Sequence, residues 1–323
     1  MRPTGRLHLG HYFGVLVNYL ELQNKNDCFF MAADLHALTT GDLSQVEVGE
    51  NTKQILIDWL SVGIDPNKAT IFVQSSIPEH SELTLLFSML TSLGWLERNP
   101  TYKEQKEALG EKNTGSLGFL SYPVLQAVDV AIYKGTLVPV GADQKPHLEM
   151  GRELIRRFNG TFKKNTFPEF EALLTKTGKL PGLDGRKMSK SYGNALELSD
   201  SPDTIRKKVN RMLTDTDRPR REDPGHPENC NLYLYHQLFT AEPTLSEIAR
   251  DCRSAVLSCG DDKKKLAEII IAWGEPIRKR RAELEKDPGY LESVISKGND
   301  KARGIAAQTM KEVREVFGFW PKL

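Results

Sequence analysis

Two groups of cationic and hydrogen-bonding residues in this chain could act on a phosphate. The first lies in Pro-Thr-Gly-Arg-Leu-His-Leu-Gly-His, residues 3–11, where His8 and His11 are three apart and share one face of a helix that begins there. Free backbone N–H groups at a helix start favour an anion, and Gly10 lets a flat ring approach the backbone. The segment is predicted to bind a nucleotide phosphate, although two surface histidines at a helix start would show the same pattern.

The second group is the lysine pair in Asp-Gly-Arg-Lys-Met-Ser-Lys-Ser-Tyr-Gly-Asn, residues 184–194. Lys187 and Lys190 lie in a loop with a glycine on each side, and its serines add hydroxyl donors. Attack on the α-phosphorus of a nucleoside triphosphate builds negative charge on the phosphate oxygens and on the departing pyrophosphate. Lysines on a mobile loop can stabilise that charge as it forms. A solvated basic loop is the simpler alternative.

The composition excludes several other classes of protein. The chain has 323 residues, 39% of them hydrophobic, and a formal net charge of +1, so it is an ordinary globular chain whose overall field does not attract nucleic acid. No apolar run approaches the roughly 20 residues that span a bilayer, and no signal peptide opens the chain. Four cysteines at irregular spacing do not form a disulfide framework, so a reducing, cytoplasmic setting is expected.

Apolar, strand-like runs alternate with helical patterns through the first part of the chain. Strands are predicted within 28–38, 69–76 and 135–144, and helices at 51–64, 79–93 and 145–158. This alternation predicts an α/β fold, a Rossmann-type parallel sheet with helices on both faces. Ligands of such sheets bind at the carboxyl ends of the strands.

From residue 198 the pattern becomes helical, with helices predicted at 201–213, 245–257, 262–286 and 299–317. We therefore predict a catalytic domain at 1–197 and an all-helical domain at 198–323. The phosphate-binding turn comes at residue 2 with no strand before it, whereas a strand normally positions such a turn. A truncated start is therefore expected; the alternative is that the turn is positioned in another way.

Together, His-x-Gly-His and the full Lys-Met-Ser-Lys-Ser sequence resemble the paired signatures of the class I aminoacyl-tRNA synthetases. Three further segments, ADLHALTT (33–40), YPVLQAVDVAIY (122–133) and VPVGADQ (138–144), make the resemblance strongest to the tryptophanyl-tRNA synthetases. The resemblance covers essentially the whole chain. The tyrosyl-tRNA synthetases share the fold and several motifs and are the nearest alternative; a non-catalytic, synthetase-like RNA-binding protein is the other.

The resemblance implies an enzyme that joins L-tryptophan to the 3′ end of tRNA(Trp) through a tryptophanyl-adenylate, using ATP with Mg²⁺ on the leaving pyrophosphate. It also implies a homodimer. The implied catalytic residues are His8, His11, Lys187 and Lys190. The implied ATP-binding residues are Arg2, Pro3, Thr4, Gly10, His11, Gly141, Ala142, Asp143, Leu180, Lys187, Met188, Ser189, Lys190 and Ser191.

The amino-acid pocket is predicted around one helix and the strand beside it. Tyr122, Gln126 and Asp129 are spaced four and three apart, so they line one helix face. An indole N–H is a donor without acceptor capacity, which suits the Asp129 carboxylate, although a phenol hydroxyl would also satisfy it. In the family, the residue matching Asp129 contacts the indole nitrogen, and many members have Met at Gln126. The predicted tryptophan-binding residues are Tyr122, Gln126, Asp129, Val138, Val140 and Gln144.

Asp34 and His36 lie at the end of a predicted strand. They could contact the substrate or cap a turn, and no catalytic role is predicted for them. Cys230, Cys252 and Cys259 are spaced like part of an iron–sulfur site found in some tryptophanyl enzymes. Because the fourth position is Asp262, and such clusters usually need four thiolates, reduced structural cysteines are predicted, with an iron–sulfur cluster as the less favoured alternative.

Basic residues cluster at 206–211, 218–221 and 278–281 in the helical part. Such clusters are usually solvated helix faces, but in a synthetase they are candidates for contacts with RNA phosphates. Sequence-specific readout of RNA prefers unpaired bases, such as those of an anticodon loop. The sequence does not indicate which side chains would read a base.

Overall fold

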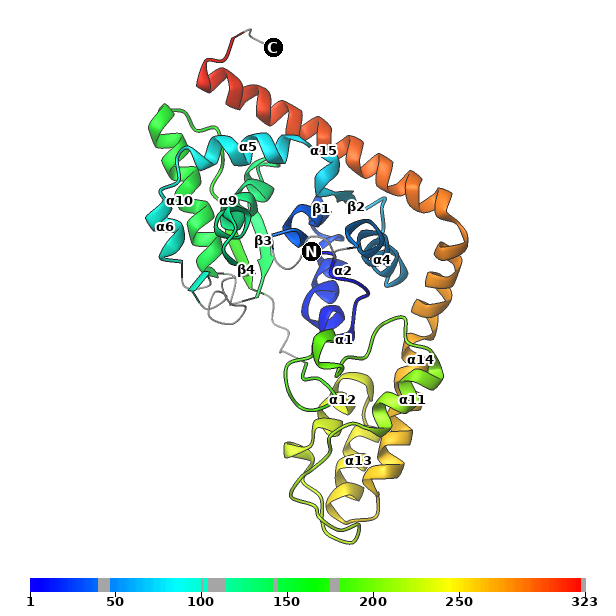
Figure 1. The fold of residues 1–323 in the computed structure, drawn as a ribbon. Helices are drawn as coiled ribbons and strands as arrows, with labels where there is room; N and C mark the ends of the chain where they lie inside the picture. Colours follow the sequence, from blue (N-terminus) through cyan, green and yellow to red (C-terminus); the bar gives the residue numbers. More distant parts are fainter. Residues whose placement is uncertain (40–46, 100–101, 104–113, 142–144, 175–179, 321–323) are drawn as a thin grey trace.

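The computed structural model describes the 323-residue chain except for residues 40–46, 100–101, 104–113, 142–144, 175–179 and 321–323. Figure 1 shows an α/β body, a group of helices that extends away from it, and one long helix that runs back along the body. The predicted fold class, a Rossmann-type α/β part with a helical C-terminal region, is confirmed. Within the described residues, no helix is long and apolar enough to cross a membrane.

The strands form two parallel pairs. β1 (Cys28–Ala32) pairs with β2 (Ala69–Val73), and β3 (Leu137–Val140) pairs with β4 (Glu171–Leu174). The first three lie within predicted strands. β4 was not predicted, because its sequence Glu-Ala-Leu-Leu is made of helix-favouring residues and all four are exposed. Pairing with β3 therefore overrides the local preference.

The helices of the α/β body are α1 (Leu9–His11), continued by a π-helical turn (Tyr12–Leu16) and α2 (Val17–Leu22), then α3 (Asp34–Ala37), α4 (Val48–Ser61), α5 (Glu79–Ser88), α6 (Leu93–Glu97), α9 (Leu117–Ala131) and α10 (Lys145–Phe162). The later helices are α11 (Pro202–Asn210), α12 (Asn231–Phe239), α13 (Thr244–Arg253), α14 (Cys259–Lys286) and α15 (Pro288–Phe317). Short 3₁₀ turns occur at Gln74–Ser76, Lys190–Tyr192 and Pro227–Asn229. As its sequence indicates, α11 begins after an N-cap, where the Ser201 hydroxyl accepts the Thr204 N–H at 3.2 Å.

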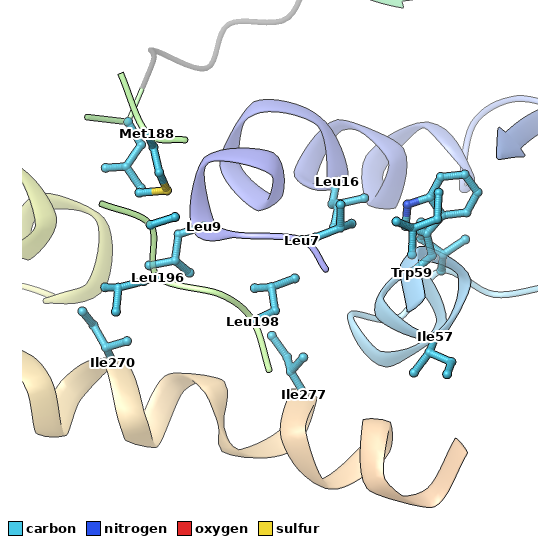
Figure 2. Close-up of a cluster of buried hydrophobic side chains, with 14 of the residues drawn as sticks. Leu7, Leu9, Leu16, Ile57, Trp59, Met188, Leu196, Leu198, Ile270 and Ile277 are labelled. Atoms are coloured by element: carbon cyan, nitrogen blue, oxygen red, sulfur yellow. The ribbon is translucent and has the colours of Figure 1, made fainter. Parts of the chain in front are cut away.

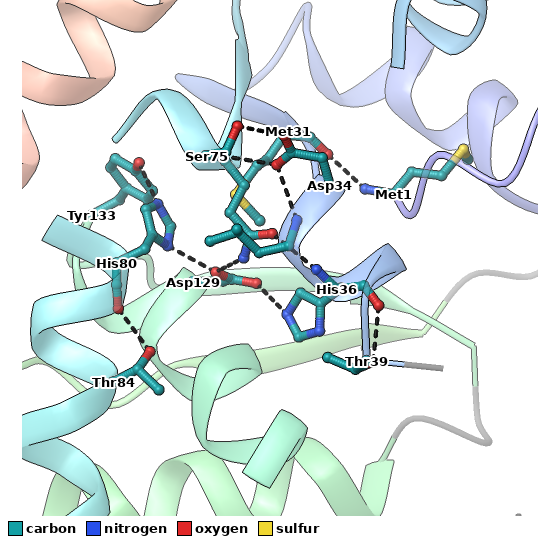
Figure 3. Close-up of polar contacts among 12 residues, drawn as sticks. Met1, Met31, Asp34, His36, Thr39, Ser75, His80, Thr84, Asp129 and Tyr133 are labelled. Atoms are coloured by element: carbon teal, nitrogen blue, oxygen red, sulfur yellow. Dashed lines mark hydrogen bonds and ion pairs between the residues drawn. The ribbon is translucent and has the colours of Figure 1, made fainter. Parts of the chain in front are cut away.

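The strand predicted at 28–38 is shorter than expected. β1 ends at Ala32 and α3 begins at Asp34, because the Asp34 carboxylate accepts the backbone N–H of Ser75 at 2.9 Å and also the Ser75 hydroxyl. The start of the chain lies beside this strand end: the Met1 ammonium donates to the Met31 carbonyl at 2.6 Å (Figure 3). The expected truncated start is not tested by this contact and stays a prediction.

A shared apolar core holds the two signature segments together. Leu7 and Leu9 flank His8, Leu196 and Leu198 follow the lysine loop, and Ile270 of α14 packs beneath them (Figure 2). The backbones also pair: the Leu9 N–H donates to Leu196 O, and the Leu198 N–H donates to Leu7 O, both at 2.9 Å. Each fully buried side chain of this size contributes about 1.5–3 kcal/mol, so the core fixes both segments on one platform.

The long helix α15 covers β2 instead of joining the helices before it (Figure 1). The Asn299 side-chain oxygen accepts the Val73 N–H at 3.0 Å, which satisfies a backbone donor of β2. A Cβ at position 298 would lie 1.8 Å from the Ile71 carbonyl oxygen, so only Gly298 permits this approach. The last helix of the predicted 198–323 domain thus packs on the α/β body, and the boundary itself stays a prediction.

Candidate active site

The histidine turn forms one end of the site. His8 is the N-cap of α1, and its ring stacks on that of His11 with centroids 3.7 Å apart. The His8 backbone N–H donates to His11 Nδ1 at 3.3 Å. His8 Nδ1 is buried and has no hydrogen-bond partner within the described part of the chain. A buried ring nitrogen without a partner is rare in protein interiors, and a bound polar ligand would satisfy it.

Both histidines are neutral near pH 7. Burial, helped by the positive charge of Lys190, lowers the pKa of His8 to about 4. Burial lowers the pKa of His11 to about 3, again helped by the charges of His8 and Lys190. Each ring therefore offers one N–H donor and one acceptor, and the positive charge at this end of the site comes from the lysine loop.

The lysine loop lies directly on the histidine turn. The sulfur of Met188 accepts the Gly10 N–H at 3.3 Å, and the Lys190 ammonium donates to the Thr4 carbonyl at 3.3 Å. Gly5 has a φ of +102°, and a Cβ there would lie 2.8 Å from Lys190 Nζ. A glycine at this position therefore gives the ammonium room to rest against the turn.

Asn194 gives the lysine loop its shape. Its side-chain oxygen accepts the Ser189 N–H at 2.8 Å, and its amide donates to the Asp184 carboxylate at 2.7 Å and to the Lys187 carbonyl at 3.1 Å. The side chain of Lys187 itself is exposed. The structure thus brings Lys190 to the histidines, while Lys187 stays on the solvent side of the loop.

At the other end of the site, three side chains converge on Asp129 of α9 (Figure 3). His36 Nε2 lies 2.8 Å from Oδ2, His80 Nδ1 lies 2.8 Å from Oδ1, and the Gln74 amide donates to Oδ1 at 2.7 Å. The other nitrogen of His80, Nε2, lies 2.7 Å from the Tyr133 hydroxyl. Asp129 therefore sits at the centre of a fixed polar network.

This network keeps Asp129 ionised. Burial opposes the charge, but the neighbouring His36 and the hydrogen bonds from His36 and His80 outweigh burial and lower the pKa of Asp129 to about 2. An ionised carboxylate held by fixed donors is a strong acceptor for one more N–H group. The Asp129 carboxylate can therefore accept a hydrogen bond from a ligand that presents a polar hydrogen.

The remaining predicted residues lie as follows. Tyr122 O–H is 3.3 Å from His147 Nε2, and burial raises the pKa of Tyr122 to about 12, so its hydroxyl stays protonated. Gln126 is half-buried on the same helix as Asp129. Also half-buried are Val138, Val140 and Gly141; Pro3 and Leu180 are buried, and Arg2 and Thr4 are exposed. Ala142, Asp143 and Gln144 lie outside the described residues, as does the side chain of Ser191.

Gln74 and His80 were missed by the sequence reasoning, and His36 was left undecided. Each follows β1 or β2 along the chain, where the carboxyl ends of parallel strands gather ligand-binding groups. That rule was the signal in the sequence that could have identified these three residues. It identifies the edge of the sheet, but it does not say that three side chains from separate segments share one carboxylate.

The cysteine group does not fit a four-thiolate cluster. Asp262 holds the fourth position and lies 3.1 Å from His236 Nε2, so the group offers three thiols where such a cluster usually needs four thiolates. Among the described residues, no group of three or more His, Cys, Asp or Glu side chains is placed to hold a metal ion.

Two arginines of the predicted RNA-binding clusters are buried instead. Arg218 donates to the Leu257 carbonyl at 3.0 Å, and Arg281 pairs with Asp58 inside the protein. Both guanidinium groups are therefore used internally. The exposed members of the clusters remain candidates for RNA contact.

The arrangement defines a class of protein. Residues 1–273 match the family described as tRNA synthetases class I (W and Y), so the chain belongs to this family. Among its relatives, the tryptophan–tRNA ligase of Thermotoga maritima is 48% identical over 98% of this chain and 97% of its own length. That of Aquifex aeolicus is 43% identical over 98% of each chain.

Solved structures agree with these relatives. The tryptophanyl-tRNA synthetase of Campylobacter jejuni, solved with ADP and tryptophan, superposes with a TM-score of 0.91 at 32% identity, covering 99% of this chain and 98% of that one. A tyrosyl-tRNA synthetase from Archaeoglobus fulgidus, solved with L-tyrosine, gives a TM-score of 0.65 at 22% identity, over 87% of this chain and 88% of that one. The second likeness bears on the fold alone.

Proposed function

We propose that this chain is a tryptophan–tRNA ligase, which activates L-tryptophan with ATP and transfers it to the 3′ end of tRNA(Trp). The observation that carries the proposal is the contact between the two signature segments, with Lys190 resting on the turn that presents His8 and His11. A relative that is 48% identical over 98% of the chain is a tryptophan–tRNA ligase, which supports tryptophan over tyrosine.

In the first step, a carboxylate oxygen of tryptophan attacks the α-phosphorus of ATP. The bond from phosphorus to the bridging oxygen breaks, and the electron pair leaves with pyrophosphate. Mg²⁺ bound with ATP would neutralise charge on that leaving group. The neutral rings of His8 and His11 donate hydrogen bonds to phosphate oxygens, and the Lys190 ammonium stabilises the charge that develops during transfer. Since no side chain attacks the substrate, positioning and electrostatics supply the rate.

The amino acid would lie between this phosphate site and Asp129. Its indole N–H would donate to the Asp129 carboxylate, which three protein donors already hold in place. Tyr122 and Gln144 would hold the α-amino group, with Val138 and Val140 against the ring. The other ATP-binding residues named from the resemblance, including Lys187 and those at 141–143, are proposed on that ground alone.

In the second step, a hydroxyl of the terminal ribose of tRNA attacks the carbonyl carbon of the adenylate and AMP leaves. The exposed basic residues of the helices after residue 198 are proposed to contact RNA phosphates, among them Lys207 of α11 and Lys279 of α14. The enzyme is proposed to act in the cytoplasm, as expected from its reduced cysteines and its tRNA substrate.

Amino-acid-dependent exchange of pyrophosphate into ATP tests the first step. We expect exchange with tryptophan and at least about 100-fold less with tyrosine, because a pocket built for one polar group discriminates strongly against another shape. Reactions without amino acid give the background. Exchange with tyrosine alone would mean that the enzyme activates tyrosine instead of tryptophan. Exchange with neither amino acid would contradict the proposed activity.

We also propose that the protein is a homodimer. Leu85, Met89, Leu93 and Leu117 are large apolar side chains that are each more than half exposed. They come from the ends of α5, α6 and α9, helices that pack on one another. A second copy of the chain packed on these helices would remove the four side chains from water. Sedimentation should give a dimer for the wild type and a monomer for Leu85→Glu/Met89→Glu; a monomeric wild type would contradict the proposal.

A further inference from the structure

A buried ion pair joins α14 to the α/β body just below the histidine turn. Asp58 of α4 is fully buried, and one of its oxygens is bound by the guanidinium of Arg281. Arg281 is itself buried and also contacts the Gln54 side chain and the Glu285 carboxylate, the latter at 3.0 Å. The guanidinium is thus held on several sides and fixes the spacing between α4 and α14.

The second oxygen of Asp58 reaches the catalytic segment itself. It accepts the backbone N–H of Leu7 at 2.8 Å, and the Leu7 carbonyl accepts the Leu198 N–H at 2.9 Å. The residue immediately before His8 is therefore held from both sides. Asp58 also interacts electrostatically with the oppositely charged Lys190 ammonium.

Stability alone is a weak reason for such a pair. Taking two charges out of water is costly, and buried ion pairs can often be replaced by apolar residues of similar volume with no loss of stability. What an apolar pair cannot supply is an acceptor for the Leu7 N–H. The feature specific to the charged pair is therefore the position of the backbone that carries His8.

We propose that Asp58 and Arg281 are positioning residues for adenylate formation. Through the Leu7 N–H they hold the histidine turn in register with α14, so the helical part and the phosphate site keep one geometry. That the positioned step is adenylate formation rests on the proposed function. The contacts of Asp58 and Arg281 do not depend on it. Neither residue touches the reacting atoms.

The test measures tryptophan-dependent pyrophosphate exchange together with thermal unfolding. Asp58→Asn leaves one side-chain oxygen for two donors, the Leu7 N–H and the Arg281 guanidinium, and Arg281→Met removes the group that holds Asp58 in place. Each should lower kcat by about 100-fold, since misplacing a catalytic group by about 1 Å has effects of that order. The KM for tryptophan, which binds at Asp129, should stay within about twofold of wild type. Arg314→Gln is the control. Arg314 of α15 forms an interhelical ion pair with Glu82, with 2.5 Å between the charged atoms, and this pair lies away from the site. The kcat of this variant should not change.

The double variant Asp58→Leu/Arg281→Met separates positioning from stability. We expect the apolar pair to restore the melting temperature while kcat remains low, because the Leu7 N–H still lacks its acceptor. Recovery of both quantities would overturn the proposal. Should the double variant fail to fold, Asp58→Asn decides: a kcat within about threefold of wild type would overturn it.

Amide exchange gives a readout that does not depend on the reaction. The peptide covering residues 1–16 should exchange faster in Asp58→Asn than in wild type and be unchanged in Arg314→Gln. If the wild type shows no tryptophan-dependent exchange of pyrophosphate, the proposed function fails. Amide exchange still tests whether Asp58 and Arg281 hold the histidine turn in place. Unchanged protection of residues 1–16 in Asp58→Asn would overturn the positioning role.

Discussion

Lys190→Ala should lower the kcat of tryptophan-dependent pyrophosphate exchange by about 100- to 1000-fold and leave the Kd for tryptophan unchanged. The reason is the place of the side chain. Its ammonium lies against the turn that presents the histidines, 3.3 Å from the Thr4 carbonyl, and away from the residues around Asp129. The group therefore acts where charge develops during phosphate transfer. Exchange kinetics give kcat, and quenching of protein fluorescence by the bound amino acid gives the Kd.

Arg186→Ala is the matched control for this prediction. Arg186 lies in the same loop and also carries one positive charge, but its guanidinium pairs with Asp184 and stacks on Tyr192 instead of reaching the histidine turn. Its loss should change kcat by less than about tenfold. Equal losses of kcat and of tryptophan affinity in Lys190→Ala would contradict a role confined to the transition state.

The ionisation of Lys190 adds a second way to test its role. Burial lowers the pKa of Lys190 below its ordinary value of 10.5, although the negative charges of Glu197 and Asp58 act the other way and Arg6 reinforces burial. The ammonium loses its proton as pH rises through this lowered value. The rate should therefore fall on the alkaline side at a pH below 10.5, with the two neutral histidines unchanged across that range.

Local pattern was enough to predict the framework of this protein. The buried runs that form β1 and β2, and the 3.6-residue period of α4 and α14, are visible because each element's own residues carry the signal. The two signature segments were also visible, since each is contiguous in sequence. Their mutual contact followed from the resemblance, and the structure adds the backbone pairing that produces it.

What could not be predicted depends on contacts between distant segments. Nothing local to His80 indicates that it shares a carboxylate with His36, because the convergence depends on how α5, α3 and α9 pack. The apolar face of α15 likewise does not specify its partner. The helix contains three glycines, Gly289, Gly298 and Gly304, and a glycine in a helix is as compatible with close approach to another helix as with approach to β2. Arg281 belongs to a predicted RNA-binding cluster, and its burial was likewise not predictable because it depends on a contact with Asp58, which is distant in the sequence.

Asp129→Asn should raise the Kd for tryptophan by about 10- to 100-fold, the loss expected when a hydrogen bond to a charged acceptor is removed. The amide replaces one carboxylate oxygen with an NH2 group, which then faces either His36 or the pair Gln74 and His80, all of which donate to the carboxylate in the wild type. The pocket then lacks its fixed acceptor for the indole N–H. At saturating tryptophan, kcat should fall by less than about tenfold, because the phosphate site is untouched. Equilibrium binding and exchange kinetics separate the two effects.

Asp215→Asn is the control for general destabilisation. Asp215 is also buried and pairs with a histidine, His226, at 3.0 Å, but it lies between α11 and α12 in the helical part of the chain. Its loss should lower the melting temperature without changing the Kd for tryptophan. An equal rise of the Kd in both variants would mean that Asp129 acts only by stabilising the fold.

The pH dependence of stability distinguishes the charge of Asp129 from its shape. A pKa lowered from 3.8 to about 2 means that the folded state favours the carboxylate, which contributes about 2 kcal/mol to the free energy of unfolding at pH 7. This contribution is complete above about pH 4 and is lost as pH falls through about 2. The Asp129→Asn variant lacks this contribution at every pH. The difference in free energy of unfolding between wild type and variant should therefore narrow between pH 4 and pH 2. A difference that is constant over this range would show that the side chain matters for its packing and not for its charge.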